Sequence, residues 1–474
     1  MSNLGAKQNQ SKVREENGLL ARMGVGLADW SERWFPDAYV FAAAAVVVTV
    51  IAALLMGRSI SQIGNDFGGR FWDLVPFTMQ MAFIVITGFV VATSKPVHKL
   101  IEVLSTIPKT SKGAVAFVAF FAMLTSLISW GFSLIFSGIL IKEISKKVQA
   151  DYRAMGAAGY LGLGSIWALG LSSSAPLLMT TKSSIPPALY KISGVIPMSQ
   201  TIFTWQNLVM IIVLTVLSVT IAYFSAPPAG RSKTAEMAGI NYGNGLVSEI
   251  PKREKPGEWL EYSPILNLFL VAVGMVYLFN TFRTKGGLAA LDLNTYNFMF
   301  LMLGMLLHWT PKAFLTSTAK SIPAVGGVLI QFPLYAGIFG IMMGSGLNDV
   351  IMKFFVSISN HNTLAPIVGV YSAILGLFLP SGGGKWIVEA PYVLEAAKQL
   401  HVNIGWIVEV YNAAEALPNF INPFWMLPLM GLMGIKARDL AGYSILQLLF
   451  HAPVVIFMVW LLAKTLPYVA PVIQ

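Results

Sequence analysis

The sequence has 474 residues, of which 55% are apolar, and its charged residues are 32 Lys and Arg and 22 Asp and Glu. A soluble chain of this length usually carries about 120 charged residues, at roughly 25% of the sequence. The deficit, together with uncharged runs such as 38–57, 74–94 and 440–463, excludes an ordinary soluble protein. The composition predicts a polytopic membrane protein.

The net charge of +10 comes from Lys and Arg in short segments between apolar runs. Positive residues in such places are typical of topology signals beside anionic lipid headgroups, so we expect the lipid bilayer and no nucleic acid as a partner. The chain has no Cys, and its five His lie far apart. We therefore expect no metal site and no redox cofactor.

The first segment, 1–37, is polar and charged and lacks the apolar stretch of a cleavable signal peptide. From 19 to 35 its pattern is amphipathic and includes Trp30, Trp34 and Phe35. This pattern predicts a cytoplasmic N-terminus with an interfacial helix.

Membrane spans, simple or broken, are predicted along the rest of the chain. In chain order they are 38–57, 71–93, 154–180, 206–226, 263–282, 294–309, 324–344, 403–433 and 440–465. Two further apolar stretches, 114–141 and 363–394, are long and have small polar residues in their middle. The middle residues are Ser126, Ser129, Trp130 and Gly131 in the first, and Pro380, Ser381, Gly382, Gly383, Gly384 and Lys385 in the second. Both stretches are predicted to be helix–turn–helix hairpins.

The positive-inside rule indicates that both hairpins are re-entrant. With a cytoplasmic N-terminus and re-entrant hairpins, 22 Lys and Arg lie inside and 9 outside, and Lys385 lies at a tip. If both stretches crossed the bilayer, the numbers would be 16 inside and 15 outside. Irregular backbone at membrane depth is tolerated where it is buried in protein or lines a watery cavity, so the two tips point to a shared solute site.

A weak internal repeat supports this architecture. Gln80 and Gln331 are 251 residues apart, as are Gly131 and Gly382, and 172–176 matches 420–423 at an offset of 247. Each half has two spans, a hairpin, a broken span and a last span. An odd number of crossings between the halves inverts the second copy, so the prediction is an all-α membrane protein of two inverted repeats, each with a re-entrant helical hairpin and a broken transmembrane helix. The first repeat is 38–226, the cytoplasmic linker 227–262, the connector helix 263–282 and the second repeat 294–465.

The second hairpin tip is the strongest candidate for a binding site. A broken helix frees N–H groups that suit a carboxylate and C=O groups that suit Na⁺. Gly382–Gly384 allow close approach of the backbone to a ligand, with a flexible turn as the alternative. Lys385 can pair with a substrate carboxylate or with Glu389 one turn later, and an ion-paired structural lysine fits the sequence equally well.

Polar residues in the two broken spans are further candidates. The hydroxyls of Ser172, Ser173 and Ser174 precede Pro176, and Asn419 and Asn422 precede Pro423 in the other half. These groups can satisfy freed backbone groups or bind a carboxylate or Na⁺.

Ionisable and amide side chains within the spans complete the set. Glu409 and Glu415 lie at membrane depth and are candidate proton or cation carriers, with Glu415 nearer to the break. Gln80 and Gln331 fit a solute path or, more simply, a helix–helix hydrogen bond.

The sequence resembles the bacterial short-chain fatty acid transporters of the acetoacetate and butyrate uptake type over about residues 25–465. The segments that carry the resemblance are 70–74 (RFWDL), 79–82 (MQMA), 129–132 (SWGF), 331–333 (QFP) and 380–386 (PSGGGKW). The sequence departs from the family pattern at Ser129, where Asn is common, and at Lys385, where His is common.

The resemblance implies uptake of short-chain monocarboxylates across the bacterial inner membrane, with the C-terminus periplasmic or extracellular. Trp130, Phe132, Trp386 and Phe424 are expected to supply a small apolar pocket. The predicted substrate-binding residues are Ser129, Trp130, Gly131, Ser172, Ser173, Ser174, Ser381, Gly382, Gly383, Gly384, Lys385, Asn419 and Asn422, and the predicted ion-coupling residues are Glu415, Glu409, Ser173 and Asn422.

We expect alternating access around the two tips, driven by H⁺ or Na⁺ and without a cofactor. The partners expected are a small monocarboxylate and, by analogy with elevator-type carriers, a second copy in a homodimer. A carrier of another organic anion and a passive channel remain alternatives. An intramembrane enzyme is disfavoured, since Gly170-Leu171-Ser172 and His451 are the sole hints of a serine hydrolase.

Overall fold

The computed structural model describes residues 38–240, 250, 252–379, 381–422 and 424–471, and every regular element within these ranges is a helix. The predictions for 1–37, Pro380 and Pro423 lie outside the described residues. Seven described segments are long and apolar enough to cross a membrane, and Tyr39–Leu55 and Leu364–Leu377 are shorter apolar helices. The predicted all-helical membrane fold is therefore confirmed.

Each predicted span and each predicted hairpin arm coincides with a helix. In the first half the helices are α3 (Ala38–Leu55), α4 (Ile60–Arg70), α5 (Val75–Ala92), α6 (Lys95–Leu104), α7 (Ser111–Ile128), α8 (Trp130–Ser145), α9 (Tyr152–Leu161), α10 (Ser174–Thr180), α11 (Pro187–Ser193) and α12 (Trp205–Ser225). After α13 (Trp259–Tyr262) and the connector α14 (Ile265–Lys285), the second half has α15 (Leu293–His308), α16 (Pro311–Ser321), α17 (Gly326–Ser345), α18 (Leu347–Ile358), α19 (Leu364–Phe378), α20 (Gly382–Gln399), α21 (Ile404–Ala416), α22 (Leu427–Met433) and α23 (Ala437–Ala463).

Four of the short helices that were not predicted also repeat. Helices α4 and α16 begin 251 residues apart, and α6 and α18 begin 252 residues apart. They have 10 to 12 residues and include charged side chains, so a search for long uncharged runs does not find them. The repeat thus includes the connecting helices as well as the spans.

The two hairpins break in the same way. Ser129 follows α7 with extended backbone (φ −155°, ψ 121°), and its hydroxyl accepts a hydrogen bond from the Phe132 N–H (3.3 Å). Ser381 has the same backbone (φ −144°, ψ 102°) and accepts from the Gly384 N–H (3.2 Å). Each serine therefore caps the second arm of its hairpin. These serines are 252 residues apart, so the structural equivalent of Gly131 is Gly383, one residue beyond the Gly382 that the sequence comparison suggested.

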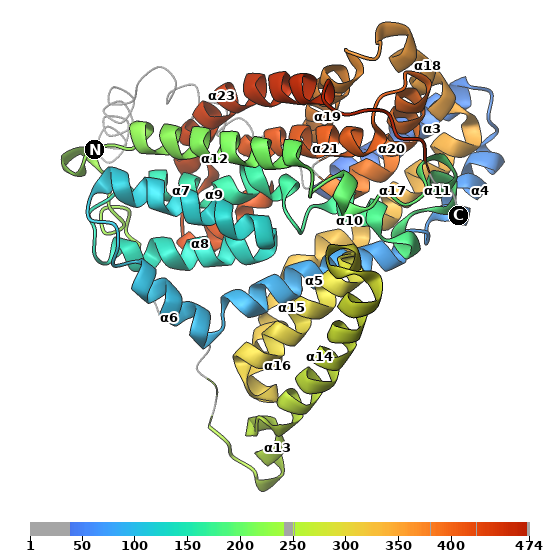
Figure 1. Cartoon of the computed structure of the whole chain (residues 1–474). Coiled ribbons are helices and arrows are strands. Elements are labelled where there is room, and N and C mark those ends of the chain that lie inside the picture. Colours follow the sequence, from blue (N-terminus) through green and yellow to red (C-terminus); the bar gives the residue numbers. More distant parts are fainter. Residues whose placement is uncertain (1–37, 241–249, 251, 380, 423, 472–474) are drawn as a thin grey trace, which may run out of the picture.

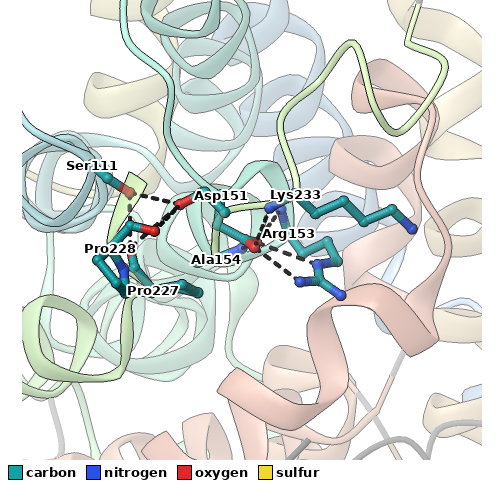
Figure 2. Close-up of polar contacts among 8 residues, drawn as sticks. Ser111, Asp151, Arg153, Ala154, Pro227, Pro228 and Lys233 are labelled. Atoms are coloured by element: carbon teal, nitrogen blue, oxygen red, sulfur yellow. Dashed lines mark hydrogen bonds and ion pairs between the residues drawn. The ribbon is translucent and has the colours of Figure 1, made fainter. Parts of the chain in front are cut away.

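The ends of each hairpin lie at the same end of the molecule. The Ser111 hydroxyl at the start of α7 donates to the Pro227 carbonyl (2.9 Å), and the Asp151 carboxylate before α9 accepts from the Lys233 N–H (3.0 Å), as Figure 2 shows. Both ends of the first hairpin thus contact one short segment, which is the start of the predicted linker. In the second hairpin, Nδ1 of His361 lies 3.4 Å from the Leu400 carbonyl oxygen. This return agrees with the charge count, and the depth of the tips in a bilayer stays a prediction.

The predicted broken spans are interrupted helices. Between α9 and α10 the chain passes through one wider, π-type turn (Gly162–Ile166), one 3₁₀ turn (Trp167–Leu169) and a further turn at 170–173. Between α21 and α22 it passes through the 3₁₀ turns Leu417–Phe420 and Phe424–Met426. Where a helix is interrupted, backbone N–H and C=O groups lose their partners within the helix. They need other hydrogen-bond partners, and the hairpin tips can provide them.

The two repeats are interleaved. Helix α17 of the second repeat packs along α3 and α4 of the first, and α5 of the first packs along α15 and α16 of the second. In Figure 1, α14–α16 lie to one side of the bundle of α7–α9, α12, α21 and α23, and α5 joins the two groups by packing on α8 as well as on α15. Neither repeat can therefore bury its apolar faces without the other.

Candidate functional site

A small cavity of about 30 Å³ lies where the two hairpin tips meet. Six of the predicted residues line it, namely Trp130, Ser174, Ser381, Gly382, Gly383 and Asn419. The remaining lining residues are Met81, Leu163, Trp167, Val328, Phe332 and Trp425, which the sequence analysis did not assign to the site. The cavity therefore combines a few polar groups with aromatic and aliphatic walls, the usual character of a small-molecule site.

Some of the residues that line the cavity are related by the internal repeat. Met81 and Phe332 are 251 residues apart, and both face it. Trp167 and Asn419 are 252 residues apart, and they also line it from equivalent positions in the two broken spans. Equivalent residues on both sides place the cavity at the junction of the repeats. The offset of the repeat is the sequence signal that could have identified Met81, Phe332 and Trp167.

The first tip is joined to the break before α10. The Trp130 N–H at the start of α8 donates to the Ser172 hydroxyl (2.9 Å), and the Leu171 N–H donates to the Leu127 carbonyl (2.7 Å). Gly170 permits this approach, since a Cβ atom there would lie 2.6 Å from the Leu127 backbone. Ser172 thus satisfies freed backbone at the tip, and it is fully buried.

The three glycines of the second tip face three aromatic rings. A Cβ atom would lie 2.6 Å from the Trp167 ring at Gly382, 2.5 Å from the Phe77 ring at Gly383 and 2.2 Å from the Tyr335 ring at Gly384. The rings come from the first broken span, from α5 and from α17. The glycines therefore provide space for aromatic packing at the start of α20, and Gly382 and Gly383 also line the cavity.

Lys385 does not line the cavity. Its side chain is fully buried and forms an ion pair with Glu415, and its ammonium donates to the Ser372 carbonyl (2.6 Å). The ammonium also lies 4.8 Å from the centroid of the Tyr411 ring. Glu389 bonds to the Ser372 hydroxyl and has no ion pair with Lys385. The structure thus pairs Lys385 with Glu415 and not with Glu389, as in the alternative of an ion-paired structural lysine, and the pairing with a substrate carboxylate stays a prediction.

The other candidates have varied environments. Gly131 packs on α5, where a Cβ atom would lie 3.2 Å from the Ile84 carbonyl oxygen. The Ser173 hydroxyl is buried without a hydrogen-bond partner among the described residues. Asn419 donates to the Leu163 carbonyl (3.3 Å), and Asn422 is buried beside the second break. Glu409 is fully buried, and neither of its carboxyl oxygens has a hydrogen-bond partner in the described part of the chain.

The structure places the two glutamines and some of the aromatic residues predicted for the pocket away from the cavity. Gln80 bonds to Asn294 (2.6 Å) and Ser184 (2.7 Å), which is the helix–helix role, and Gln331 is buried on α17. Of the aromatics expected in the pocket, Trp130 lines the cavity, whereas Trp386 packs on the Tyr411 ring with 4.6 Å between the ring centroids. The side chain of Phe424 lies outside the described residues.

Interleaved inverted repeats, paired helical hairpins and broken helices around a shared cavity define a membrane transporter. A family profile described as "Short chain fatty acid transporter" matches residues 19–462. The chain belongs to this family. It is not an enzyme, as the family and its relatives are transporters.

Two relatives cover nearly the whole chain. One, from Escherichia coli (strain K12), carries the name "Putative short-chain fatty acid transporter", and it is 33% identical over 445 residues, which are 94% of this chain and 99% of the relative. Another of the same name, from Haemophilus influenzae, is 31% identical over 92% of this chain and 99% of its own length.

Two solved structures share the fold. The YdaH transporter of Alcanivorax borkumensis, described as having an unusual topology, has a TM-score of 0.58 at 13% identity and covers 92% of this chain and 100% of its own. MtrF of Neisseria gonorrhoeae, described as illuminating a class of antimetabolite efflux pumps, has a TM-score of 0.57 at 12% identity, covering 91% and 97%. At this identity the likeness establishes the fold alone.

Proposed function

We propose that this protein takes up short-chain monocarboxylates, such as butyrate or acetoacetate, across the bacterial inner membrane by alternating access, coupled to H⁺ or Na⁺. The observation that carries the proposal is the cavity shared by the two hairpin tips. Helices α8 and α20 both begin at its wall, at Trp130 and Gly382. The N-terminal ends of helices carry partial positive charge and free N–H groups, which favour a carboxylate.

The lining favours one carboxylate per substrate. Ser174, Ser381 and Asn419 are neutral, and none of the described lining residues is charged. A dicarboxylate would need a second anion site with further donors, so the alternative of a dicarboxylate carrier has less support. The tryptophans, Met81 and Phe332 suit a short alkyl tail, in which each buried methylene contributes about 0.8 kcal/mol.

The size of the cavity supports alternating access over a permanent channel. A volume of about 30 Å³ holds roughly two waters, because one water needs about 10–15 Å³. A four-carbon acid is larger, so the tips must separate from the opposite wall to admit it. The proposed orientation places the N-terminus in the cytoplasm and the C-terminus outside, as the distribution of Lys and Arg favours.

The test is uptake of radiolabelled butyrate and acetoacetate into proteoliposomes under separately imposed proton and Na⁺ gradients. Protein-free liposomes are measured in parallel, because uncharged short-chain acids cross bilayers unaided. Saturable uptake above this background, reduced in Ser381→Ala and Ser174→Ala and unchanged in Thr220→Ala at an exposed position of α12, is the expected result. Absence of saturable uptake of both acids in folded protein contradicts the proposal.

A further inference from the structure

The buried charges of the second hairpin extend the proposed function to the identity of the coupling ion. Lys385 and Glu389 lie one turn apart on α20, and Glu415 reaches Lys385 from α21. All three side chains are at most 1% exposed. Charged groups are rarely buried to this extent unless they are paired, and in membrane proteins such groups mark ion pathways.

The cluster contains one more carboxyl group than it has cations. Lys385 and Glu415 compensate each other as an ion pair. One oxygen of Glu389 bonds to the Ser372 hydroxyl, and the other has no hydrogen-bond partner among the described residues. As a carboxylic acid Glu389 leaves the cluster neutral, and as a carboxylate it adds one uncompensated negative charge at a fully buried position. The cluster can therefore exchange one proton.

The groups that face this cluster come from four helices. They are Tyr335 of α17, Tyr371 and Ser372 of α19, Tyr392 of α20, and Tyr411 and Glu415 of α21. Helices α11 and α18 also pack on α20, but their charged residues Lys191, Asp349 and Lys353 are exposed at the surface. Within the described chain Lys385 is thus the one cation of the cluster.

Tyr411 links the cluster to the cavity. Its hydroxyl donates to the Gly382 carbonyl (2.5 Å) at the cavity wall, and its ring lies beneath the Lys385 ammonium. Ser381 and Gly382, which line the cavity, are also within one helical turn of Lys385 on the same tip. A change of charge at the cluster therefore acts on the backbone that surrounds the substrate.

The first repeat has no such cluster. At an offset of 252 residues, Lys385 corresponds to Ser133, Glu389 to Ser137 and Glu415 to Leu163. Ser133 also donates to a carbonyl of the facing hairpin arm, that of Ala122 (2.6 Å), as Lys385 does in the second repeat. A hydrogen bond between the hairpin arms thus recurs, but the three charged side chains belong to the second repeat alone, which indicates a task beyond packing.

We propose that the Lys385–Glu415 pair and Glu389 form the proton-coupling site of the transporter, with Glu389 the carboxyl that carries the coupled proton and Lys385 a fixed countercharge. The inference rests on the proposed function and selects H⁺ from the two ions left open there. The proton adds to a carboxyl oxygen of Glu389 on one side of the membrane and leaves from it on the other. One carboxylate then moves with one proton, and Na⁺ is not required.

The test compares Glu389→Gln with wild type in three assays. The matched control is Glu395→Gln, which changes a half-buried carboxylate further along α20 that pairs with Lys398 at 3.3 Å. The first assay is uptake driven by an imposed pH difference, with both sides kept well above the pKa of the acid to limit passive leak. The second is exchange of labelled for unlabelled butyrate without a gradient, over a range of pH. The third is infrared difference spectroscopy of purified protein between acidic and alkaline pH, which needs no substrate.

Wild type and Glu395→Gln are expected to accumulate butyrate about tenfold for each unit of pH difference, as one-to-one coupling requires. Glu389→Gln is expected to lose this accumulation, to keep exchange within about twofold because the amide preserves the bond to Ser372, and to show no pH dependence of exchange. Its spectrum should lack one protonated-carboxyl band that wild type shows.

Other outcomes overturn the inference. The first is accumulation of butyrate by Glu389→Gln at the wild-type level, and the second is loss of both exchange and accumulation in folded Glu389→Gln. The third is wild-type uptake that is driven by Na⁺ and not by protons. The fourth is the same protonated-carboxyl band in the infrared spectra of both proteins. If wild type transports neither acid but the carboxyl band is lost in Glu389→Gln, the proposed substrate fails while the titrating carboxyl stands.

Discussion

Ser129 and Ser381 occupy equivalent positions 252 residues apart, and each ends one hairpin arm and caps the next through its own hydroxyl. Both capped helices begin at the wall of one cavity. The internal repeat of the chain therefore includes the place where the substrate is proposed to bind.

The caps give the first prediction. Ser129→Ala and Ser381→Ala should each lower the free energy of unfolding by about 1 kcal/mol, since each removes one N-cap hydrogen bond. Ser381 also lines the cavity, so its variant should in addition weaken monocarboxylate binding by about tenfold. Thermal unfolding in detergent and the concentration dependence of uptake measure the two effects. Equal transport defects in both variants would show that the cap, and not the cavity hydroxyl, is responsible.

The second prediction concerns the contact between Gly384 and the Tyr335 ring. Gly384→Ala places a methyl group 2.2 Å from the Tyr335 ring and should destabilise the protein by about 1–3 kcal/mol through overpacking. The matched control is Gly431→Ala, because a Cβ atom at Gly431 meets no atom within 4 Å. Adding Tyr335→Leu to Gly384→Ala should recover part of the loss in thermal stability. Wild-type stability of the single variant would contradict the role given to this glycine.

The Lys385–Glu415 pair gives the third. Lys385→Met leaves a buried carboxylate without its partner and should cost about 3–5 kcal/mol of stability, whereas Lys385→Met with Glu415→Gln should recover most of that loss. Thermal unfolding of both variants in detergent tests this difference. If the double variant is no more stable than the single one, the two side chains are not energetically coupled.

The fourth prediction concerns Asp151, which holds the segment that follows α12. Asp151 is fully buried, pairs with Arg153 (2.9 Å) and accepts hydrogen bonds from the N–H groups of Ala154 (3.0 Å) and Lys233 (3.0 Å) (Figure 2). Asp151→Asn should therefore release the segment around Lys233 and lower stability by about 2 kcal/mol. Faster tryptic cleavage after Lys233 is the expected readout. Asp349→Asn, at an exposed position of α18, should leave the cleavage rate unchanged.

The last helices of the two repeats give the fifth. Ser218 of α12 lies 2.8 Å from Nε2 of His451 on α23, and Nδ1 of that ring lies 2.8 Å from the Gln447 carbonyl. Ser218→Ala should cost about 1 kcal/mol, because it removes a buried hydrogen bond between the two repeats. Thr220→Ala, exposed on the same helix, is the control in the same thermal unfolding assay. This contact joins the two repeats and gives His451 a structural role.

Much of the fold could be predicted from the sequence, because the requirement to satisfy backbone groups in lipid allows few solutions. The long uncharged runs predicted the spans, and the distribution of Lys and Arg predicted that 114–141 and 363–394 return to the side where they start. The short helices α4, α6, α16 and α18 were missed, since a helix with one apolar face and several charges has no long uncharged run.

Composition, charge and the weak repeat by themselves determined the class of this protein, the two hairpins and the polar residues near their tips, because these follow from local pattern and from the physics of the bilayer. The tertiary structure alone decided which of those residues share a cavity and which partner Lys385 takes. Trp167, Phe332 and Met81 join the tips only after the repeats interleave. Glu415 and Lys385 are 30 residues apart and meet because α21 packs on α20. Contacts between helices distant in sequence depend on the packing of whole helices, which no local pattern records.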